Sequence, residues 1–396
     1  MIPRLQIRYG WRDAWLALRS LGIRLSQQDR LWASLRLDCG KARFFPTRRG
    51  REALYLILKG LALPRGARVG VPLFACSTIA KTVVAAGMMP IFLDADPRTF
   101  GLNLDDLKRK AGNLDCLVLV HMFGYPADFH SVKQLMQGKP IVEDCAHAVG
   151  SSFRGHALGT IAATSFFSFG FFKPVAVGGG GLVVTQSESV AARIEELLLG
   201  APEETPCQAI LHSTRCFLYA LAFRQPAYSI LAYLRARDQG DTSIGIENDT
   251  AGEIAAPRLM AMRRSDWGVL PSRLSSFDAE SERNEEFWAQ LRNVRQFGLK
   301  IPPEPPFGQW NHFMLPVRER TEADCLGAIA QLRGRGIGAA RLYPNCAQYA
   351  RAARYSGDCP VAERLARTVF TMPSHVGLSE GARDQILRAI QQLRTP

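Results

Sequence analysis

Short apolar runs alternate with helix-like segments through residues 50–200, and this alternation constrains the fold more than any other feature of the sequence. The apolar runs are Val69–Pro72, Pro90–Leu93, Leu117–Val120, Ile141–Glu143 and Leu182–Thr185. Leu117–Val120 is apolar at every position, which is typical of a strand buried on both faces. Because helix-like segments such as Ala53–Leu63 and Ser77–Ala86 separate the runs, we expect an α/β fold in which helices flank a mostly parallel central sheet.

The length of 396 residues exceeds that of most single domains, so we expect a large domain and a smaller one. Residues 258–296 are predicted to form a pair of long helices. A smaller C-terminal α+β domain is predicted from a strand near Phe313 and helices at Glu322–Arg333, Val361–Phe370 and Gly381–Leu393. The expected division is a basic N-terminal arm in residues 1–45, a large domain in 46–256, and long helices with the small domain in 257–396.

The formal net charge is +13, and much of the excess lies in residues 1–51, which hold twelve basic and three acidic residues. Such an excess can serve nucleic acid, an anionic membrane surface or phosphorylated substrates. No aromatic RNA-binding signature or zinc-finger spacing accompanies it. We therefore expect a basic solvated surface and no nucleic-acid partner.

The nine cysteines include no Cys-x-x-Cys pair, and their odd number argues against a complete disulfide framework. The N-terminus lacks the apolar core of a signal peptide, and no uninterrupted run approaches the length of a membrane span. We therefore expect a cytoplasmic protein with reduced thiols and no metal site.

An apolar stretch at residues 208–235, with Arg and Gln scattered through it, has two interpretations. It can be an amphipathic segment that makes peripheral contact with a membrane surface or with a partner. Helices packed at a subunit interface are the favoured alternative.

Lys173 closes the aromatic-rich run Ser165–Pro174, which the four glycines Gly178–Gly181 soon follow. Burial among aromatic side chains disfavours an ammonium group and lowers its pKa. A desolvated amine of this kind is suited to form a Schiff base with an aldehyde. Ser168, five residues earlier, can offer its hydroxyl to a phosphate. Taken alone, Lys173 also fits a surface lysine.

The apolar run Ile141–Glu143 leads into Asp144, and His147 follows three residues later. An acid at the carboxyl edge of a parallel sheet lies where open α/β folds bind ligands. Such a carboxylate can keep the nitrogen of a bound pyridine protonated, so that the ring accepts electrons. Asp144 is favoured over Glu143 because the shorter acid opens the turn, and His147 can lie beside the ring. Singly, the acid also fits a helix N-cap and the histidine an ordinary loop position.

Gly50 and Arg51 lie in a turn that opens a helix. Backbone N–H groups at a helix N-terminus bind phosphate well, and Arg51 can add a charged fork. The segment Pro72–Thr78 follows a strand and is expected to lie above the bound ring, with Cys76 and Ser77 in contact with it.

The order of these motifs resembles the DegT/DnrJ-type sugar aminotransferases, which use pyridoxal 5′-phosphate (PLP) and have the aspartate-aminotransferase fold. The resemblance covers about residues 46–200 and, more loosely, the end of the chain. The segments that carry it are Val71–Pro72, Pro90–Asp94, Val120–Asp128, Glu143–Gly150, Phe167–Phe169, Lys173 and Gly180–Thr185. It implies a PLP-dependent transferase of fold type I and a homodimer with active sites at the subunit interface.

By resemblance, Lys173 is the Schiff-base lysine, Asp144 the partner of the ring nitrogen and His147 the residue beside the ring. Ser168 and the Gly50–Arg51 turn are expected to hold the cofactor phosphate. Both the cofactor and this set of residues are therefore expectations of the resemblance.

Several departures from the family pattern fall on the substrate side. Pro174 and Gly179 stand where the family usually has Asn and Glu, and Cys76 stands where an aromatic is often found. The usual His-Tyr pair is absent from the stretch that contains Arg341 and Tyr343. The candidate substrate residues are Arg341, Tyr343 and Arg263, and the arginines Arg51, Arg263, Arg264 and Arg341 can each meet a diphosphate.

We therefore predict a PLP-dependent aminotransferase that takes an amino group from an amino acid, expected to be glutamate. The expected acceptor is a nucleotide-linked keto sugar used in polysaccharide or glycoconjugate biosynthesis, and Lys173 is expected to move the proton. Two alternatives stay open. The same site can run another PLP reaction, such as sugar dehydration or amino-acid chemistry, or the fold can serve as a membrane-surface or interaction protein that has lost turnover.

Overall fold

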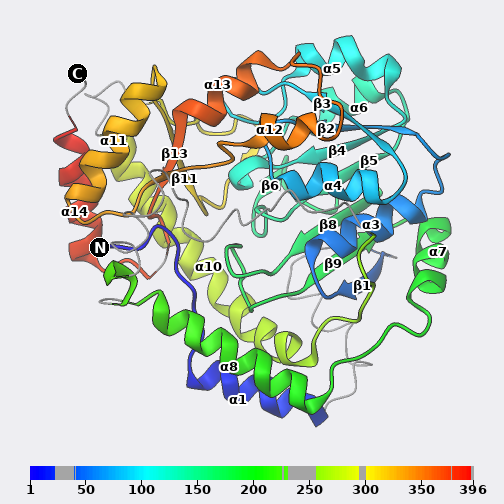
Figure 1. Cartoon of the computed structure of the whole chain (residues 1–396), viewed down its shortest axis with the longest axis horizontal. Helices are drawn as coiled ribbons and strands as arrows, with labels where there is room; N and C mark the ends of the chain where they lie inside the picture. Colours follow the sequence, from blue (N-terminus) through cyan, green and yellow to red (C-terminus); the bar gives the residue numbers. More distant parts are fainter. Residues whose placement is uncertain are drawn as a thin grey trace.

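The structure is a computed structural model that describes residues 1–22, 40, 42–224, 227–230, 256–293, 300–375 and 377–393. A seven-stranded sheet forms its centre (Figure 1), in the order β1-β9-β8-β5-β4-β2-β3. The strands are β1 Arg43–Thr47, β2 Arg68–Pro72, β3 Met89–Leu93, β4 Cys116–Val120, β5 Ile141–Asp144, β8 Thr164–Ser168 and β9 Gly181–Thr185. The five strands from β8 to β3 are parallel, whereas β9 pairs antiparallel with both of its neighbours, β8 and the edge strand β1. The predicted α/β class with a mostly parallel sheet is confirmed.

Helices cover both faces of this sheet because successive residues of the strands point to opposite sides. Val118 packs into one core with helices α3 Gly50–Gly60, α4 Ser77–Ala85 and α7 Glu188–Leu198. Leu117 and Leu119 pack into a second core with α5 Leu104–Lys110 and α6 Phe129–Met136. All five residues of β4 are buried, which explains why its sequence shows no alternation.

The C-terminal part has its own antiparallel sheet, in the order β11-β13-β12. Its elements are β11 Leu315–Arg318, α11 Glu322–Gly334, β12 Ala340–Arg341, α12 Cys346–Arg351, α13 Pro360–Thr368, β13 Val369–Met372 and α14 Glu380–Gln391. The predicted helix Val361–Phe370 is wrong at its end, because the chain turns into β13 at Val369. Val369 and Phe370 are β-formers, and both are fully buried in register with β11.

A single helix, α10 Arg264–Asn293, replaces the predicted helix pair. It continues through Pro271 although proline removes a backbone donor. Buried apolar side chains anchor the helix on both sides of the proline, with Leu270 and Leu274 nearby and Trp288 farther along. Tertiary packing therefore outweighs the local signal of the proline.

The described part of the predicted N-terminal arm is built into the fold. Ile2 forms a β-bridge with Ile337 of the C-terminal part, and the buried Arg4 donates a hydrogen bond from Nη1 to Thr371 Oγ1 at 2.9 Å. Helix α1 Trp11–Arg19 packs against α10 and against α8 Pro206–Ala222. The expectation of a basic solvated surface is therefore wrong for the buried Arg4, whereas Arg12 and Arg19 are exposed; residues 23–39 and 41 lie outside the described part.

The remaining short elements are the sheet β10-β6-β7, formed by β6 Ser152–Phe153, β7 His156–Ala157 and β10 Gly308–Gln309, and the 3-10 turns Ser20–Gly22, Ala111–Asn113 and Met122–Gly124. Across the described residues no helix is long and apolar enough to cross a bilayer. The eight described cysteines are all free thiols. The division at residues 45 and 256 and the cytoplasmic location stay predictions.

Candidate active site

A cavity of about 400 Å³ lies at the carboxyl ends of the parallel strands, next to the N-terminus of α3. Nine of the predicted site residues line it: Gly50, Arg51, Cys76, Asp144, His147, Ser168, Lys173, Arg263 and Tyr343. These residues come from positions almost 300 apart in the chain, and the fold brings them to one place. Ser77 and Arg341 do not line this cavity.

Asp144 is the last residue of β5, and its neighbour Glu143 points to the opposite face of the strand. The backbone N–H of Ala146 donates to Asp144 Oδ1 at 2.9 Å, which fixes the carboxylate at the strand end. Burial raises the pKa of the Asp144 carboxyl, while that hydrogen bond and the charge of Lys173 oppose the rise. The carboxylate therefore has a strong physical reason to pair with a cation in the cavity.

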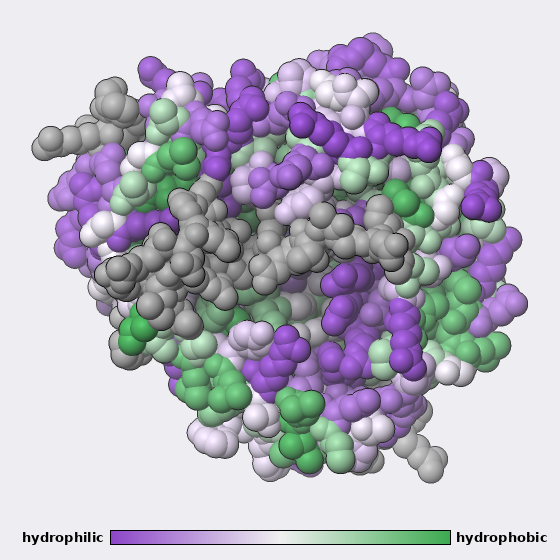
Figure 2. All heavy atoms as spheres, viewed as in Figure 1, coloured by the Kyte–Doolittle hydropathy of each residue, from purple (hydrophilic) through white to green (hydrophobic). Residues whose placement is uncertain are grey.

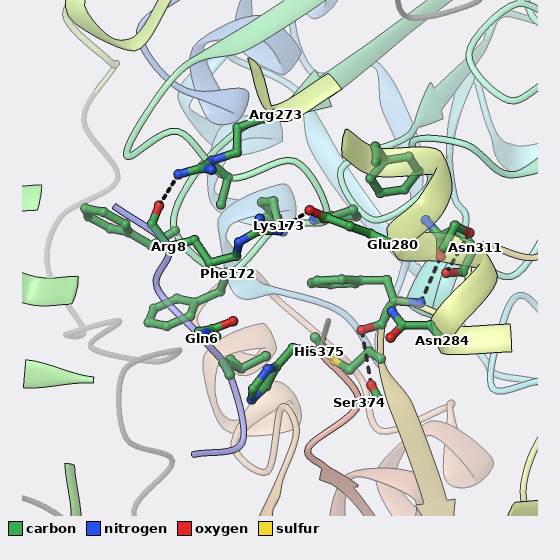
Figure 3. Close-up of a pocket in the computed structure, with 18 of the residues that line it drawn as sticks. Gln6, Arg8, Phe172, Lys173, Arg273, Glu280, Asn284, Asn311, Ser374 and His375 are labelled. Atoms are coloured by element: carbon green, nitrogen blue, oxygen red, sulfur yellow. Dashed lines mark hydrogen bonds and ion pairs between the residues drawn. The ribbon is translucent and has the colours of Figure 1, made fainter. Parts of the chain in front are cut away.

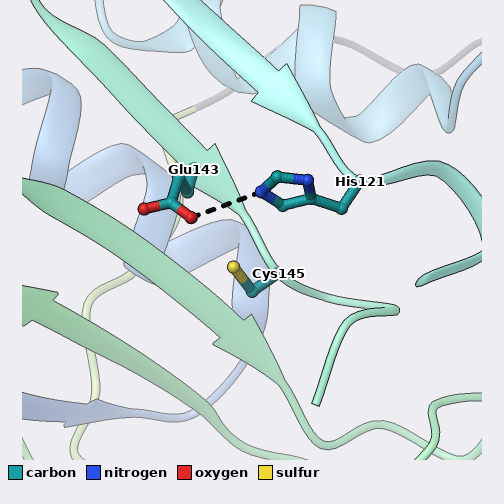
Figure 4. A group of neighbouring side chains, drawn as sticks. All are labelled: His121, Glu143 and Cys145. Carbon is teal, nitrogen blue, oxygen red and sulfur yellow. Dashed lines mark hydrogen bonds and ion pairs between the residues drawn. The ribbon is translucent and has the colours of Figure 1, made fainter. Parts of the chain in front are cut away.

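The Glu143 carboxylate accepts hydrogen bonds from backbone N–H groups on its own side of the sheet. Its carboxylate accepts from the N–H groups of Gly159 at 2.9 Å, Ile161 at 3.0 Å and Ala162 at 2.5 Å. His121 Nε2 lies 3.3 Å away (Figure 4). These hydrogen bonds leave Asp144 as the acid at the strand end that faces the cavity, and its role there stays a prediction.

His121, Glu143 and Cys145 form a buried group whose ligand atoms are close enough for a metal ion (Figure 4). Metal binding by cysteine requires the thiolate, and burial raises the pKa of Cys145 well above its usual range, reinforced by the charge of Glu143. The Glu143 oxygens are already occupied by backbone donors. The hydrogen bond between His121 and Glu143, and those from the backbone to Glu143, therefore stabilise the structure behind the cavity.

Lys173 lies on the loop between β8 and β9, where its backbone N–H donates to the Gly170 carbonyl at 3.1 Å. Burial lowers the pKa of its amine, while Cys76 and Asp144 favour the charged form. Ser168 is the last residue of β8 and so lies just before this loop. The strand end therefore holds Ser168 rigidly on the cavity wall.

Behind Lys173 lies a second, smaller cavity of about 60 Å³ (Figure 3). The N-terminal segment supplies Arg8, and α10 supplies Arg273 and Glu280. Arg8 forms an ion pair with Glu280, and Arg273 Nη2 donates to the Arg8 carbonyl at 2.6 Å. The N-terminal segment thus closes one side of the loop that carries the lysine.

His147 is buried beside the cavity, and Asn311 Nδ2 donates to its carbonyl at 2.7 Å. Burial, with the nearby charge of Lys173, holds the pKa of the imidazole well below its usual range. Its Nδ1 has no hydrogen-bond partner among the described residues. A buried ring with an unsatisfied nitrogen is suited to accept a polar group of a bound molecule.

The phosphate-binding turn predicted around Gly50 has the required geometry. Gly50 is the first residue of α3, and a Cβ built on it would lie only 2.7 Å from Ser168 Cβ. The preceding Arg49 makes no side-chain cap to the helix. The first-turn N–H groups, the Ser168 hydroxyl and Arg51 therefore lie together beside the cavity, as anion binding requires.

Of the candidate substrate residues on β12 and just after it, one lines the cavity and the other does not. Tyr343 lines the cavity, and its ring packs edge-on against Phe74 with centroids 5.8 Å apart. Arg341 instead forms an ion pair with Glu322, with Nη1 and Oε1 2.5 Å apart. The prediction that Arg341 meets the substrate directly therefore lacks support in this geometry.

Ser77 opens α4 and faces a neighbouring apolar cavity of about 400 Å³. Its Oγ is buried without a hydrogen-bond partner among the described residues, and Cys76 lines both this cavity and the main one. Only Cys76 of the two predicted contacts therefore reaches the main cavity.

Sequence reasoning missed Arg49, His212 and Arg215 on the cavity wall. His212 and Arg215 come from α8, and His212 Nε2 lies 2.7 Å from Asp266 Oδ1 on α10. Arg263, which was predicted to meet a substrate, lies 3.4 Å from Glu204. No motif in the sequence links residue 212 to residue 266, because the pairing depends on how two helices pack.

The chain is similar to known proteins over most of its length. The profile of the DegT/DnrJ/EryC1/StrS aminotransferase family matches residues 34–218 and 262–391. The GDP-perosamine synthase of Escherichia coli O157:H7 is 33% identical over 147 residues, which is 36% of this chain and 40% of that protein. The match therefore spans less than half of that relative's length.

A longer match is to the UDP-N-acetyl-3-dehydro-alpha-D-glucosamine 3-aminotransferase of Acidithiobacillus ferrooxidans, 27% identical over 352 residues, covering 87% of this chain and 82% of that protein. Among solved structures, the sugar aminotransferase CalS13 of Micromonospora echinospora has a TM-score of 0.76 at 20% identity and 99% coverage of both chains. The sugar aminotransferase Spr1654 of Streptococcus pneumoniae, in its PMP-form, has a TM-score of 0.78 at 18% identity and 99% coverage of both chains. These structures share the fold and confirm the predicted fold class.

Proposed function

The chain belongs to the DegT/DnrJ/EryC1/StrS aminotransferase family, as its motifs predicted, and on this basis we propose that it is a PLP-dependent aminotransferase. The observation that carries the proposal is the arrangement of Lys173 and Asp144. Both line one cavity, and each shifts the protonation of the other while burial opposes both charges. A PLP enzyme needs an amine for the aldehyde and an acid for the ring nitrogen.

The residues present fit the cofactor at three further points. The first turn of α3 and Ser168 form a compact anion site that suits a phosphate, because Gly50 leaves room for backbone N–H groups to approach. His147 offers an unsatisfied buried nitrogen beside the ring position. Cys76 stands on the cavity wall near Lys173, where its charge interaction favours the protonated amine.

When bound, the cofactor supplies an electron sink for the carbon that loses its proton. Lys173 Nζ would serve as the base that takes this proton and the acid that returns it, because burial lowers the pKa of the amine. Asp144 would keep the ring nitrogen protonated. His147 stays neutral, since its pKa is held low, and therefore adds no positive charge next to Lys173.

We propose glutamate as the amino donor and a nucleotide-linked keto sugar as the acceptor. The names of GDP-perosamine synthase and of UDP-N-acetyl-3-dehydro-alpha-D-glucosamine 3-aminotransferase support a nucleotide-linked sugar. Arg51 and Arg215 on the cavity wall offer charge to a diphosphate. Arg263 contributes less, because Glu204 and Asp266 already lie beside it.

A homodimer in the cytoplasm completes the proposal. The family resemblance supports the dimer, with active sites at the subunit interface. Sedimentation of the purified chain at several concentrations measures the oligomeric state directly.

The decisive experiment compares absorption spectra of the purified protein with those of Lys173→Ala. Wild type should carry the band of lysine-bound PLP, and borohydride should fix the cofactor covalently on the peptide that contains Lys173. Lys108→Ala is the matched control, because Lys108 is exposed on α5 far from the cavity residues. Labelling of another lysine, or an unchanged spectrum in Lys173→Ala, would refute the assignment.

Addition of glutamate then tests the reaction type. Loss of the lysine-bound band and appearance of the pyridoxamine form supports transamination. Pro174 and Gly179 depart from the family pattern near Lys173, which keeps another PLP reaction as the second candidate. That candidate predicts release of water from a sugar nucleotide without consumption of an amino donor.

A further inference from the structure

Two helices outside the central sheet, α1 and α8, lie side by side at the lower edge of Figure 1. Both expose large apolar side chains: Trp11, Trp15 and Leu18 on α1, and Ile210, Leu211, Leu218, Tyr219 and Leu221 on α8. Trp11 is 79% exposed and Leu211 72%. We call this set the α1/α8 face. Figure 2 shows hydrophobic residues gathered along the same edge, with hydrophilic residues between them.

The two helices contact each other through aromatic rings. The ring of Trp11 lies 4.6 Å from that of Phe217, measured between centroids. The exposed side chains therefore belong to one surface. Monomeric proteins rarely expose a continuous apolar surface unless it binds something.

The charges on the α1/α8 face are basic. Arg12 and Arg19 are exposed, and the guanidinium of Arg19 lies 5.1 Å above the Trp15 ring. The one acid in these two helices, Asp13, is buried and forms an ion pair with Arg273 at 2.9 Å. The face thus combines tryptophan and leucine with arginines that no carboxylate of α1 or α8 neutralises.

Charge distinguishes between the two occupants that the sequence left open. A symmetric contact between two copies would bring two surfaces of the same positive charge together, and neither helix offers an exposed carboxylate to pair with the arginines. An anionic bilayer instead takes the apolar side chains into its interface and pairs its headgroups with the arginines. Charge complementarity therefore favours a membrane.

Much of the face also lies outside the part of the chain that the family profile matches. The profile begins at residue 34, after α1, and leaves out residues 219–261, which include the end of α8. A binding surface common to the whole family would be expected inside the matched part.

We propose that the α1/α8 face binds the surface of an anionic lipid bilayer, with both helices parallel to the membrane plane. The other side of α8 carries His212 on the wall of the candidate active site. A helix with its side chains is about 10–12 Å across. Membrane binding would therefore place the cavity within about that distance of the headgroups. This proposal does not depend on the aminotransferase reaction.

Flotation of the full chain with lipid vesicles tests the proposal. Vesicles of phosphatidylcholine mixed with phosphatidylserine should carry the protein to the top of the gradient, and pure phosphatidylcholine should carry much less. Added salt should weaken the binding, because the arginines contribute through screened charge.

Two double variants separate the contributions. Arg12→Glu/Arg19→Glu should lower the partition coefficient by about 25-fold or more, since each surface arginine contributes about 1 kcal/mol. Trp15→Ser/Leu211→Ser should lower it by about tenfold or more through lost apolar burial. The matched controls are Arg388→Glu on α14 and Leu326→Ser on α11, which are exposed on other helices and should leave binding unchanged.

Equal flotation of wild type and both double variants would overturn the proposal, as would absence of binding to the anionic vesicles. Size-exclusion chromatography with light scattering gives the third outcome. If Trp15→Ser/Leu211→Ser converts a dimer to monomers, the α1/α8 face is a subunit interface and the membrane proposal is wrong. Circular dichroism of each variant confirms that the comparison is between folded proteins.

Discussion

Replacing Gly50 by alanine tests whether the first turn of α3 must press against the end of β8. A Cβ on residue 50 would lie 2.7 Å from Ser168 Cβ and 3.0 Å from Ser168 Oγ. Carbon atoms in contact are normally about 3.5–4.0 Å apart, so the helix or the strand must move. We expect Gly50→Ala to lower the free energy of unfolding by about 1–3 kcal/mol, the usual cost of overpacking.

The neighbouring atoms identify the source of this cost. Ser168→Gly removes both close atoms, and the nearest remaining atom, the Phe167 carbonyl oxygen, is 3.5 Å away and in ordinary contact. Alanine at residue 50 should therefore cost little when residue 168 is glycine. The expected coupling energy between the two substitutions is about 1–3 kcal/mol.

Urea unfolding of the wild type, the two single variants and the double variant measures this coupling. Gly327→Ala is the control, because a Cβ there meets nothing within 4 Å on α11 and should stabilise the helix by up to about 1 kcal/mol. Titration with PLP then measures affinity, which should fall in Gly50→Ala and recover in the double variant. If Gly50→Ala lowers the free energy of unfolding equally with serine and with glycine at residue 168, the contact with Ser168 does not cause the loss of stability, which contradicts the prediction.

Three further predictions follow from the same geometry. Asp144→Asn should slow the half-reaction with glutamate by about tenfold to a thousandfold, because a carboxylate partner shifts the pKa of a cation by about 1–3 units; stopped-flow absorption measures it. Arg51→Ala should weaken binding of a phosphate-bearing ligand in calorimetry, whereas Arg341→Ala should leave it unchanged and cost about 1 kcal/mol of stability, since Arg341 pairs with the exposed Glu322. Burial lowers the pKa of His312 to about 4 in the folded chain, compared with about 6.5 in the unfolded chain. Between these two pH values the unfolded chain binds a proton and the folded chain does not, so the free energy of unfolding falls as the pH drops from about 6.5 to about 4. His312→Phe should make that fall smaller, by up to about 3 kcal/mol at pH 4 in urea titrations.

The parallel strands of the sheet could be predicted because their residues are apolar on both faces. β8 was not among the predicted strands. Its serines look like loop residues, but Ser165 is fully buried and its Oγ donates to the Gly159 carbonyl at 2.6 Å. A polar residue whose hydrogen bond is made by a distant segment carries no signal in the local pattern.

The cofactor side of the cavity was accessible to sequence reasoning because its residues sit at fixed places on strands and helix ends. Asp144 closes β5, and Gly50 opens α3. Tyr343 and Arg263 were also predicted, but the part of the wall that α8 contributes was not, because its position depends on how α8 packs against α10. Pairing between residues 212 and 266 depends on helix packing, which periodicity alone does not determine.

At Gly179 the sequence lacks an acidic residue that the family usually has, but the structure still places a carboxylate at that position. The family usually has Glu at this position, so the sequence suggested that a carboxylate was missing. A Cβ built on Gly179 would lie 2.7 Å from Asp266 Oδ2, so the carboxylate of α10 occupies the space that a side chain at residue 179 would fill. His212 Nε2 holds the other oxygen of Asp266 at 2.7 Å. An acid therefore still stands behind the glycine loop, supplied by a different helix, and the absence of Glu at residue 179 is no argument against catalysis.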